Sequence, residues 1–233
     1  MCDVRRKLIL TNVVIEKYRK WQEEVNEISE IYVYKGFSTT LLMKLLYLSC
    51  LFSIKGTQEK TYRKTPFGVL DKWIALPNGP AEDDVYSAIG YQPMPTVVYD
   101  LSQEDGCKYS KFEIDKKNLE KIKAYYRVGD NDIAIDNVLD DLVKIFKLEE
   151  YRLQIEGGFD TLVERIKEVD ENKKIDVSTQ EKNNCTIDYL SNLTHLILWN
   201  AALNRDEKRL ATNNIYLLKD EYGKLEKHLN KQN

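Results

Sequence analysis

The hydrophobic positions in the first part of the chain predict two helices of different character. From residue 10 to residue 32, apolar side chains recur every three or four positions between charged ones, as in an amphipathic helix. The spacing also fits a short coiled-coil seam, but packing on the rest of the domain is favoured because the pattern stops at Gly36. The residues of this stripe are Leu10, Val14, Tyr18, Trp21, Val25, Ile28 and Tyr32.

The second helix is expected at the centre of the core. Nearly every position from residue 41 to residue 54 is apolar, and Ser38, Thr39 and Thr40 precede this stretch as candidate N-caps. A helix that is apolar almost all round is buried. The sequence therefore predicts a buried central helix at about 40–54.

The region after this helix contains the strongest turn signals. Pro77 and Pro80 disfavour helix in the residues before them, so we expect a tight bend at 75–80, with Pro80 in the first turn of the next helix. Further on, β-prone segments flank Asp105-Gly106, a pair typical of hairpin turns. The sequence therefore predicts a small β-hairpin near 95–115.

Helical periodicity returns after this hairpin and continues to the C-terminal part of the chain. Gly157-Gly158 predicts a turn between two of these helices, and the polar stretch 169–185 predicts an exposed loop. The fold class expected from these patterns is all-α, a helical bundle around the central helix with one small hairpin. We divide the chain into an N-terminal amphipathic helix extension (1–36), a helical domain (37–204) and a C-terminal helix (205–233).

Composition narrows the possible functions. Hydrophobic residues make up 42% of the chain, charged residues 31%, and the net charge is -3, which does not give the basic stripe typical of nucleic-acid binding. No segment approaches the roughly 18 uninterrupted apolar residues that a membrane span needs. The four cysteines and two histidines are not at metal-ligand spacing. We expect a cytoplasmic protein with no metal, no cofactor and no membrane or nucleic-acid partner.

Sequence signatures of catalysis are missing. The chain has no GxGxxG, Walker lysine loop, GxSxG or HExxH motif, and neighbouring acidic pairs such as Asp83-Asp84 do not face each other on a helix. His195 precedes Trp199 by four residues, so helical spacing places both side chains on one face. We interpret His195 as a buried structural residue, with a catalytic or ligand-binding role as the alternative. The chain is therefore not expected to be an enzyme.

Three segments share a more specific pattern: KLLYLSCLF at 44–52, DKWIALPNGPAEDDVYSAI at 71–89 and LSNLTHLILWNAAL at 190–203. In order and character they resemble the Panacea domain, also called the SocA-like antitoxin domain. Residues 196–198 depart from it, because they are apolar where the family has polar residues and a proline. The positions that match are Lys44, Leu45, Leu46, Tyr47, Trp73, Gly79, Pro80, Val85, Tyr86, Leu193, Thr194, His195, Trp199 and Ala201.

The resemblance implies protein binding rather than catalysis. Panacea-like proteins are antitoxins that neutralise toxins by direct contact, or adaptors that hand a toxin to a protease. The alternative is a phage or mobile-element protein that binds a host or anti-phage defence component. The motif residues are then expected to hold the fold, while aromatic residues outside the motifs contact the partner. The candidates for this contact are Tyr32, Tyr34, Tyr91, Tyr99 and Tyr109.

Overall fold

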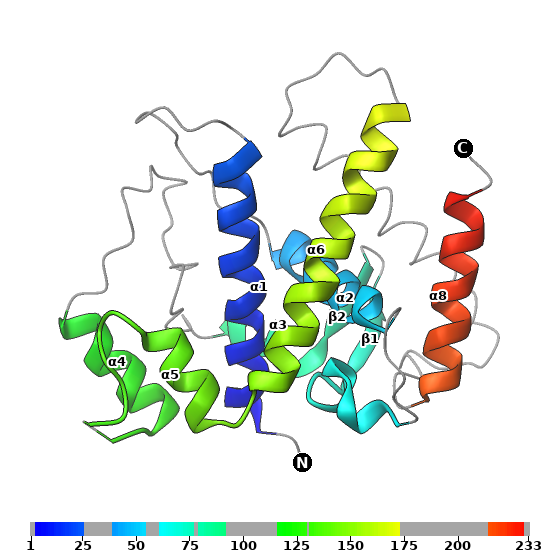
Figure 1. The fold of residues 1–233 in the computed structure, drawn as a ribbon. Coiled ribbons are helices and arrows are strands. Elements are labelled where there is room, and N and C mark those ends of the chain that lie inside the picture. The colour runs from blue at the N-terminus through cyan, green and yellow to red at the C-terminus, as the bar shows by residue number, and fades with distance from the viewer. Residues whose placement is uncertain are drawn as a thin grey trace.

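The structure of the protein is a computed structural model, and it describes residues 3–25, 39–54, 61–76, 79–91, 116–129, 131–172 and 214–230. These parts of the chain are mostly helical, with one two-stranded antiparallel hairpin (Figure 1), which confirms the expected fold class. The helices are α1 (Val4–Val25), α2 (Thr39–Ser53), α3 (Asp83–Tyr91), α4 (Lys116–Tyr126), α5 (Val138–Ile145), α6 (Glu149–Asn172) and α8 (Ile215–Leu229), and the strands are β1 (Trp73–Leu76) and β2 (Gly79–Glu82).

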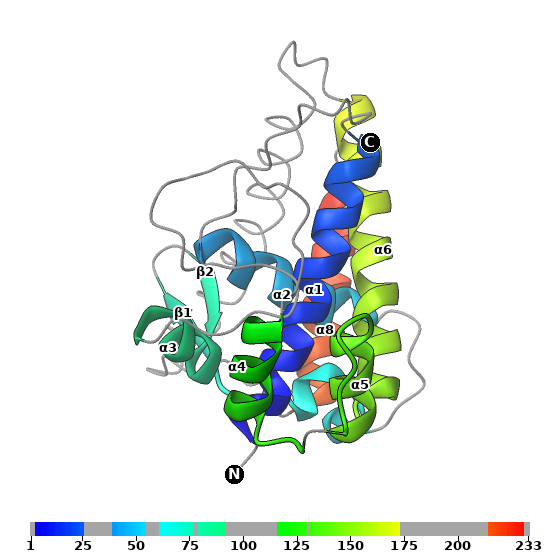
Figure 2. The ribbon, with the colours of Figure 1, turned by 90° about the vertical axis from the view of Figure 1, so that its left-hand side faces the viewer.

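Helix α2 is the centre of the core, as its sequence predicts. Every residue from Leu42 to Phe52 is buried. Its most extensive contacts are with α6, and it also packs on β2, α1 and α8. Helices α1 and α6 lie side by side with α2 behind them (Figures 1 and 2). An apolar helix enclosed in this way removes a large hydrophobic area from water, which is the main force that stabilises the fold.

Helix α1 is enclosed on all sides over residues 7–15 and amphipathic only after them, and its predicted apolar stripe faces the core. Leu10, Val14, Tyr18 and Trp21 are all buried and belong to the same cluster as the side chains of α2 and α6. The predicted stripe is therefore confirmed as far as Trp21. The positions at Ile28 and Tyr32 lie outside the described residues.

The hairpin of the structure precedes α3 and differs from the expected bend. β1 and β2 pair with Trp73 opposite Glu82 and Leu76 opposite Gly79, so the expectation that Pro80 starts a helix is wrong. Proline lacks an amide hydrogen, but a two-stranded ribbon has edges where that donor is not needed. Gly79 has a φ of 129°, a conformation that L side chains rarely adopt. The one hairpin that the sequence predicts, near 95–115, lies outside the described residues, and the hairpin at residues 73–82 was not predicted.

Helix α6 corrects the prediction of a turn at Gly157-Gly158. It runs without interruption through both glycines to Asn172, so the first part of the loop expected at 169–185 is helical. The physical reason is close packing, since a Cβ on Gly158 would lie 2.0 Å from the backbone oxygen of Ser49 on α2. None of the helices in the described ranges is long and apolar enough to cross a membrane.

Candidate functional site

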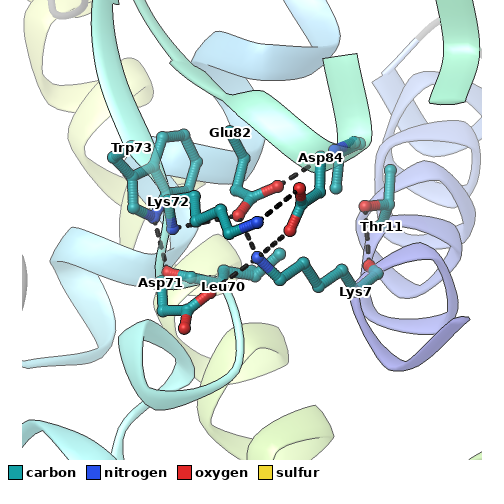
Figure 3. Close-up of polar contacts among 9 residues, drawn as sticks. Lys7, Thr11, Leu70, Asp71, Lys72, Trp73, Glu82 and Asp84 are labelled. Atoms are coloured by element: carbon teal, nitrogen blue, oxygen red, sulfur yellow. Dashed lines mark hydrogen bonds and ion pairs between the residues drawn. The ribbon is translucent and has the colours of Figure 1, made fainter. Parts of the chain in front are cut away.

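A lysine with no exposed side-chain surface lies where α1 meets the hairpin and α3 (Figure 3). The Nζ atom of Lys7 is 2.6 Å from Asp71 Oδ1, 2.5 Å from Glu82 Oε1 and 2.7 Å from Asp84 Oδ2. Each contact is short enough to be a charge-assisted hydrogen bond. The three hydrogen atoms of the ammonium group are therefore matched by three carboxylates.

The hairpin brings these three carboxylates together. Asp71 precedes β1, Glu82 ends β2 and Asp84 lies in the first turn of α3, so pairing of the two strands places both ends of the hairpin side by side. Glu82 also accepts hydrogen bonds from the backbone amides of Lys72 and Val85, both at 3.0 Å. It therefore closes the open end of the hairpin and caps α3, since the Val85 amide belongs to the first turn of that helix.

Electrostatics explain why these charges are tolerated inside the protein. Burial tends to lower the pKa of Lys7, but the hydrogen bonds with the three carboxylates outweigh burial and raise that pKa, so the amine stays protonated. Burial raises the pKa of Glu82 even though Lys7 opposes the shift. For Asp84 burial acts in the same direction, but hydrogen bonds from Lys7 and Lys72 outweigh it and lower the pKa.

The arrangement limits the chemistry that this site can support. One oxygen from each of the three carboxylates lies within 4.8 Å of the other two, the type of oxygen set that hard cations use. The ammonium group of Lys7 already holds these oxygens. A protonated amine has no free electron pair, which does not suit a lysine nucleophile. The site is best described as an ion network around the buried Lys7–Glu82 pair, which joins α1 to the hairpin and α3.

A second cluster, made of aromatic side chains, joins two of the three motif segments. The ring of Tyr47 lies 4.9 Å from that of Trp73 and 5.9 Å from that of Phe67, both in edge-to-face geometry. The indole nitrogen of Trp73 donates a 2.8 Å hydrogen bond to the Leu70 carbonyl. Lys44, Gly79 and Pro80 are also buried. Buried side chains of the first two motif segments therefore pack against each other in the core.

Tyr86 is the motif residue whose expected position is wrong. We expected both Trp73 and Tyr86 to be buried; Trp73 is 1% exposed, whereas Tyr86 is 43% exposed. Adjacent residues of a helix point about 100° apart, and in α3 it is Val85 that faces the core. The next side chain, Tyr86, therefore faces outward.

The remaining predicted positions are not described by the structure. The third motif segment, with Thr194, His195 and Trp199, lies outside the described residues. The same holds for Tyr32, Tyr34, Tyr99 and Tyr109, and of Tyr91 the structure describes only its place at the end of α3. The roles predicted for these residues stay predictions.

No protein-family model, curated protein or solved structure matches the chain. The resemblance to the Panacea domain therefore depends on the residues that carry it. The structure describes the first of these segments and the second apart from residues 77 and 78. Sequence reasoning did not find the Lys7 network, although Lys7 lies three residues before Leu10, in line with the apolar stripe of α1.

The lowered pKa of Asp84 leads to a testable pH dependence. A carboxyl group with a depressed pKa stabilises the fold above its unfolded-state pKa, and this contribution is lost as the pH falls. Asp84→Asn is therefore expected to lower the free energy of unfolding by about 1–3 kcal/mol at pH 7, the range for a hydrogen bond to a charged group. The difference from wild type should shrink below a pH of about 4.

Urea unfolding of both proteins between pH 7 and pH 3 measures this difference. Asp83→Asn is the matched control, because Asp83 is the neighbouring residue in the same turn of α3 and no ion pair is described for it. The control should change the stability by less than about 0.5 kcal/mol. If the loss of stability in Asp84→Asn did not change with pH, the negative charge of Asp84 would not be what stabilises the fold.

Proposed function

We propose that the protein is a non-catalytic binding module of antitoxin or proteolytic-adaptor type, which neutralises a protein toxin by direct contact. The observation that carries the proposal is the packing of Tyr47 against Trp73. These two residues belong to separate motif segments, and their contact fits the expectation that the motifs of the resemblance hold the fold. A fold held in this way leaves the outer surface free to vary with the partner.

The exposed position of Tyr86 supports the same proposal. Tyrosine is enriched at the centres of protein interfaces, where its ring is buried and its hydroxyl group makes a hydrogen bond. Tyr86 lies one helical turn after Asp83, so the outer face of α3 combines an aromatic ring with a negative charge. We therefore add Tyr86 to the residues proposed to contact the partner.

Co-expression with the product of the neighbouring gene tests the proposed function. The expected result is a complex of fixed stoichiometry on size-exclusion chromatography, together with rescue of growth when the neighbouring product is toxic. Recovery of a host or defence protein instead would favour the alternative of a phage or mobile-element protein. If neither kind of protein forms a complex, the proposal fails.

Tyr86→Ala is expected to weaken the complex without affecting the fold. Truncation of an aromatic residue at the centre of an interface costs about 2 kcal/mol or more, which corresponds to a loss of affinity of roughly 30-fold. Calorimetric titration with the co-purified partner measures the affinity. Leu153→Ala is the control, because Leu153 is a large side chain on α6 that is 69% exposed. Equal affinities for the two variants would exclude Tyr86 from the interface.

A further inference from the structure

Helix α3 is anchored by contacts at its first turn. The Glu82 carboxylate accepts a 3.0 Å hydrogen bond from the Val85 amide, and the Val85 side chain is fully buried. Asp84 accepts hydrogen bonds from the ammonium groups of Lys7, at 2.7 Å, and Lys72, at 2.9 Å (Figure 3). The first turn of α3 is therefore held by a charge network as well as by apolar packing.

A helix as short as α3 needs such anchors to keep its position. It has nine residues, and isolated helices shorter than about 12 residues are marginal in water. Tyr86, which is 43% exposed, follows directly after the anchored residues 82–85. The backbone of α3 therefore determines where the Tyr86 ring is presented. Figure 2 shows α3 beside the hairpin at one edge of the molecule, on the opposite side from α6.

We propose that Glu82, together with Lys7, is a positioning residue for the partner surface at Tyr86. Neither Glu82 nor Lys7 can contact a partner, because both side chains have no exposed surface. They act through α3, since Glu82 caps this helix and Lys7 holds Glu82 and Asp84 against α1. The affinity for a partner then falls with the fraction of molecules in which this network is closed.

This inference rests on the proposed function, because it names the residues that prepare the surface at which a partner is proposed to bind. Its first step is that Glu82 holds α3 in place, which can be measured on the protein alone. Failure of this step and failure to find a partner are therefore separate results.

Hydrogen exchange of the full chain tests the first step. Glu82→Ala is expected to raise the exchange rates at residues 87–89 about tenfold relative to those of α4, because loss of a helix cap favours local opening. Glu82→Gln keeps an acceptor oxygen for the Val85 amide and should stay closer to wild type. Gly158→Ala is the control for a general loss of stability, because it disturbs the contact of α6 with α2 and should leave these relative rates unchanged.

Unchanged relative rates in Glu82→Ala would overturn the proposal whether or not a partner is found. Asp84→Asn weakens the same turn at a partly exposed residue, and its relative rates should rise in the same direction. It decides the first step if Glu82→Ala does not fold.

Calorimetric titration with the co-purified partner tests the second step. Glu82→Ala is expected to weaken binding about tenfold, and Glu82→Gln should recover most of this loss. In the Tyr86→Ala background Glu82→Ala should have little further effect, because the network acts on binding through Tyr86. Equal losses in both backgrounds, or a loss no larger than that of Gly158→Ala, would show that Glu82 contributes only to stability and would overturn the proposal.

Discussion

Lys7→Met is expected to lower the free energy of unfolding by about 3–5 kcal/mol, the range for breaking a buried ion pair from one side. Methionine has nearly the same length, so the loss comes from charge rather than from a cavity. The substitution leaves Asp71, Glu82 and Asp84 close together, and Lys72 still pairs with Asp84. Domains of this size have about 5–15 kcal/mol of stability, so the loss is a substantial part of the total.

Chemical denaturation at pH 7 measures this loss, and two further variants make the result specific. Lys20→Met changes the same residue type on the same helix, where the side chain is 54% exposed and pairs with Glu16; it should cost less than about 0.5 kcal/mol. Glu82→Gln added to Lys7→Met removes one buried charge and should recover part of the stability. If Lys7→Met and Lys20→Met were equally stable, Lys7 would not be held by three carboxylates.

The helical core could be predicted because its signals are local. The spacing of Leu10, Val14, Tyr18 and Trp21 predicts one buried stripe of α1, although residues 7–15 are buried on every side, and the apolar run of α2 predicts its central position. Both patterns depend only on residues within a few turns of one another. Hydrophobic burial then brings such helices together without a need for specific long-range partners.

The ion network could not be predicted from local patterns. Lys7 is separated from its three acceptors by 64, 75 and 77 residues in the sequence. A lysine in line with an apolar stripe indicates either an exposed helix end or a buried charge, and only the position of the hairpin decides between them. The register of β1 and β2 brings Glu82 beside residues 71 and 72. These residues are ten or more positions apart in the sequence, and the periodicity of a helix does not predict such a contact.

The glycine pair of α6 is a second feature that local sequence patterns do not predict, because the contact that matters is made by Gly158 with a distant part of the chain. In the sequence, Gly157-Gly158 resembles a helix stop because glycine is a poor helix former. In the structure Gly158 lies where α6 crosses α2, and the absent side chain lets the two backbones approach. The stabilising contact belongs to another helix more than 100 residues earlier in the sequence, so the pattern around the pair carries no sign of it.

Substitution of these two glycines by alanine is expected to have opposite effects. A Cβ on Gly158 would lie 2.0 Å from the Ser49 oxygen and 2.8 Å from the Ser53 nitrogen, both backbone atoms of α2. Because a helix backbone cannot give way as a side chain can, the two helices must separate. Overpacking usually costs about 1–3 kcal/mol, and we expect Gly158→Ala to reach the upper end of that range.

Gly157→Ala is the matched control, because it introduces the same methyl group one residue earlier in the same helix. Apart from its own helix, no atom of the described part of the chain lies within 4 Å of a Cβ at Gly157, so the helix propensity is the main change, and the variant should be more stable by about 0.5–1 kcal/mol. Thermal and urea unfolding of the two variants against wild type measure both effects. Two stabilised variants would mean that α6 and α2 are further apart than described. Two destabilised variants would mean that the chain needs a turn at the glycine pair, since alanine favours a continuous helix and opposes a break.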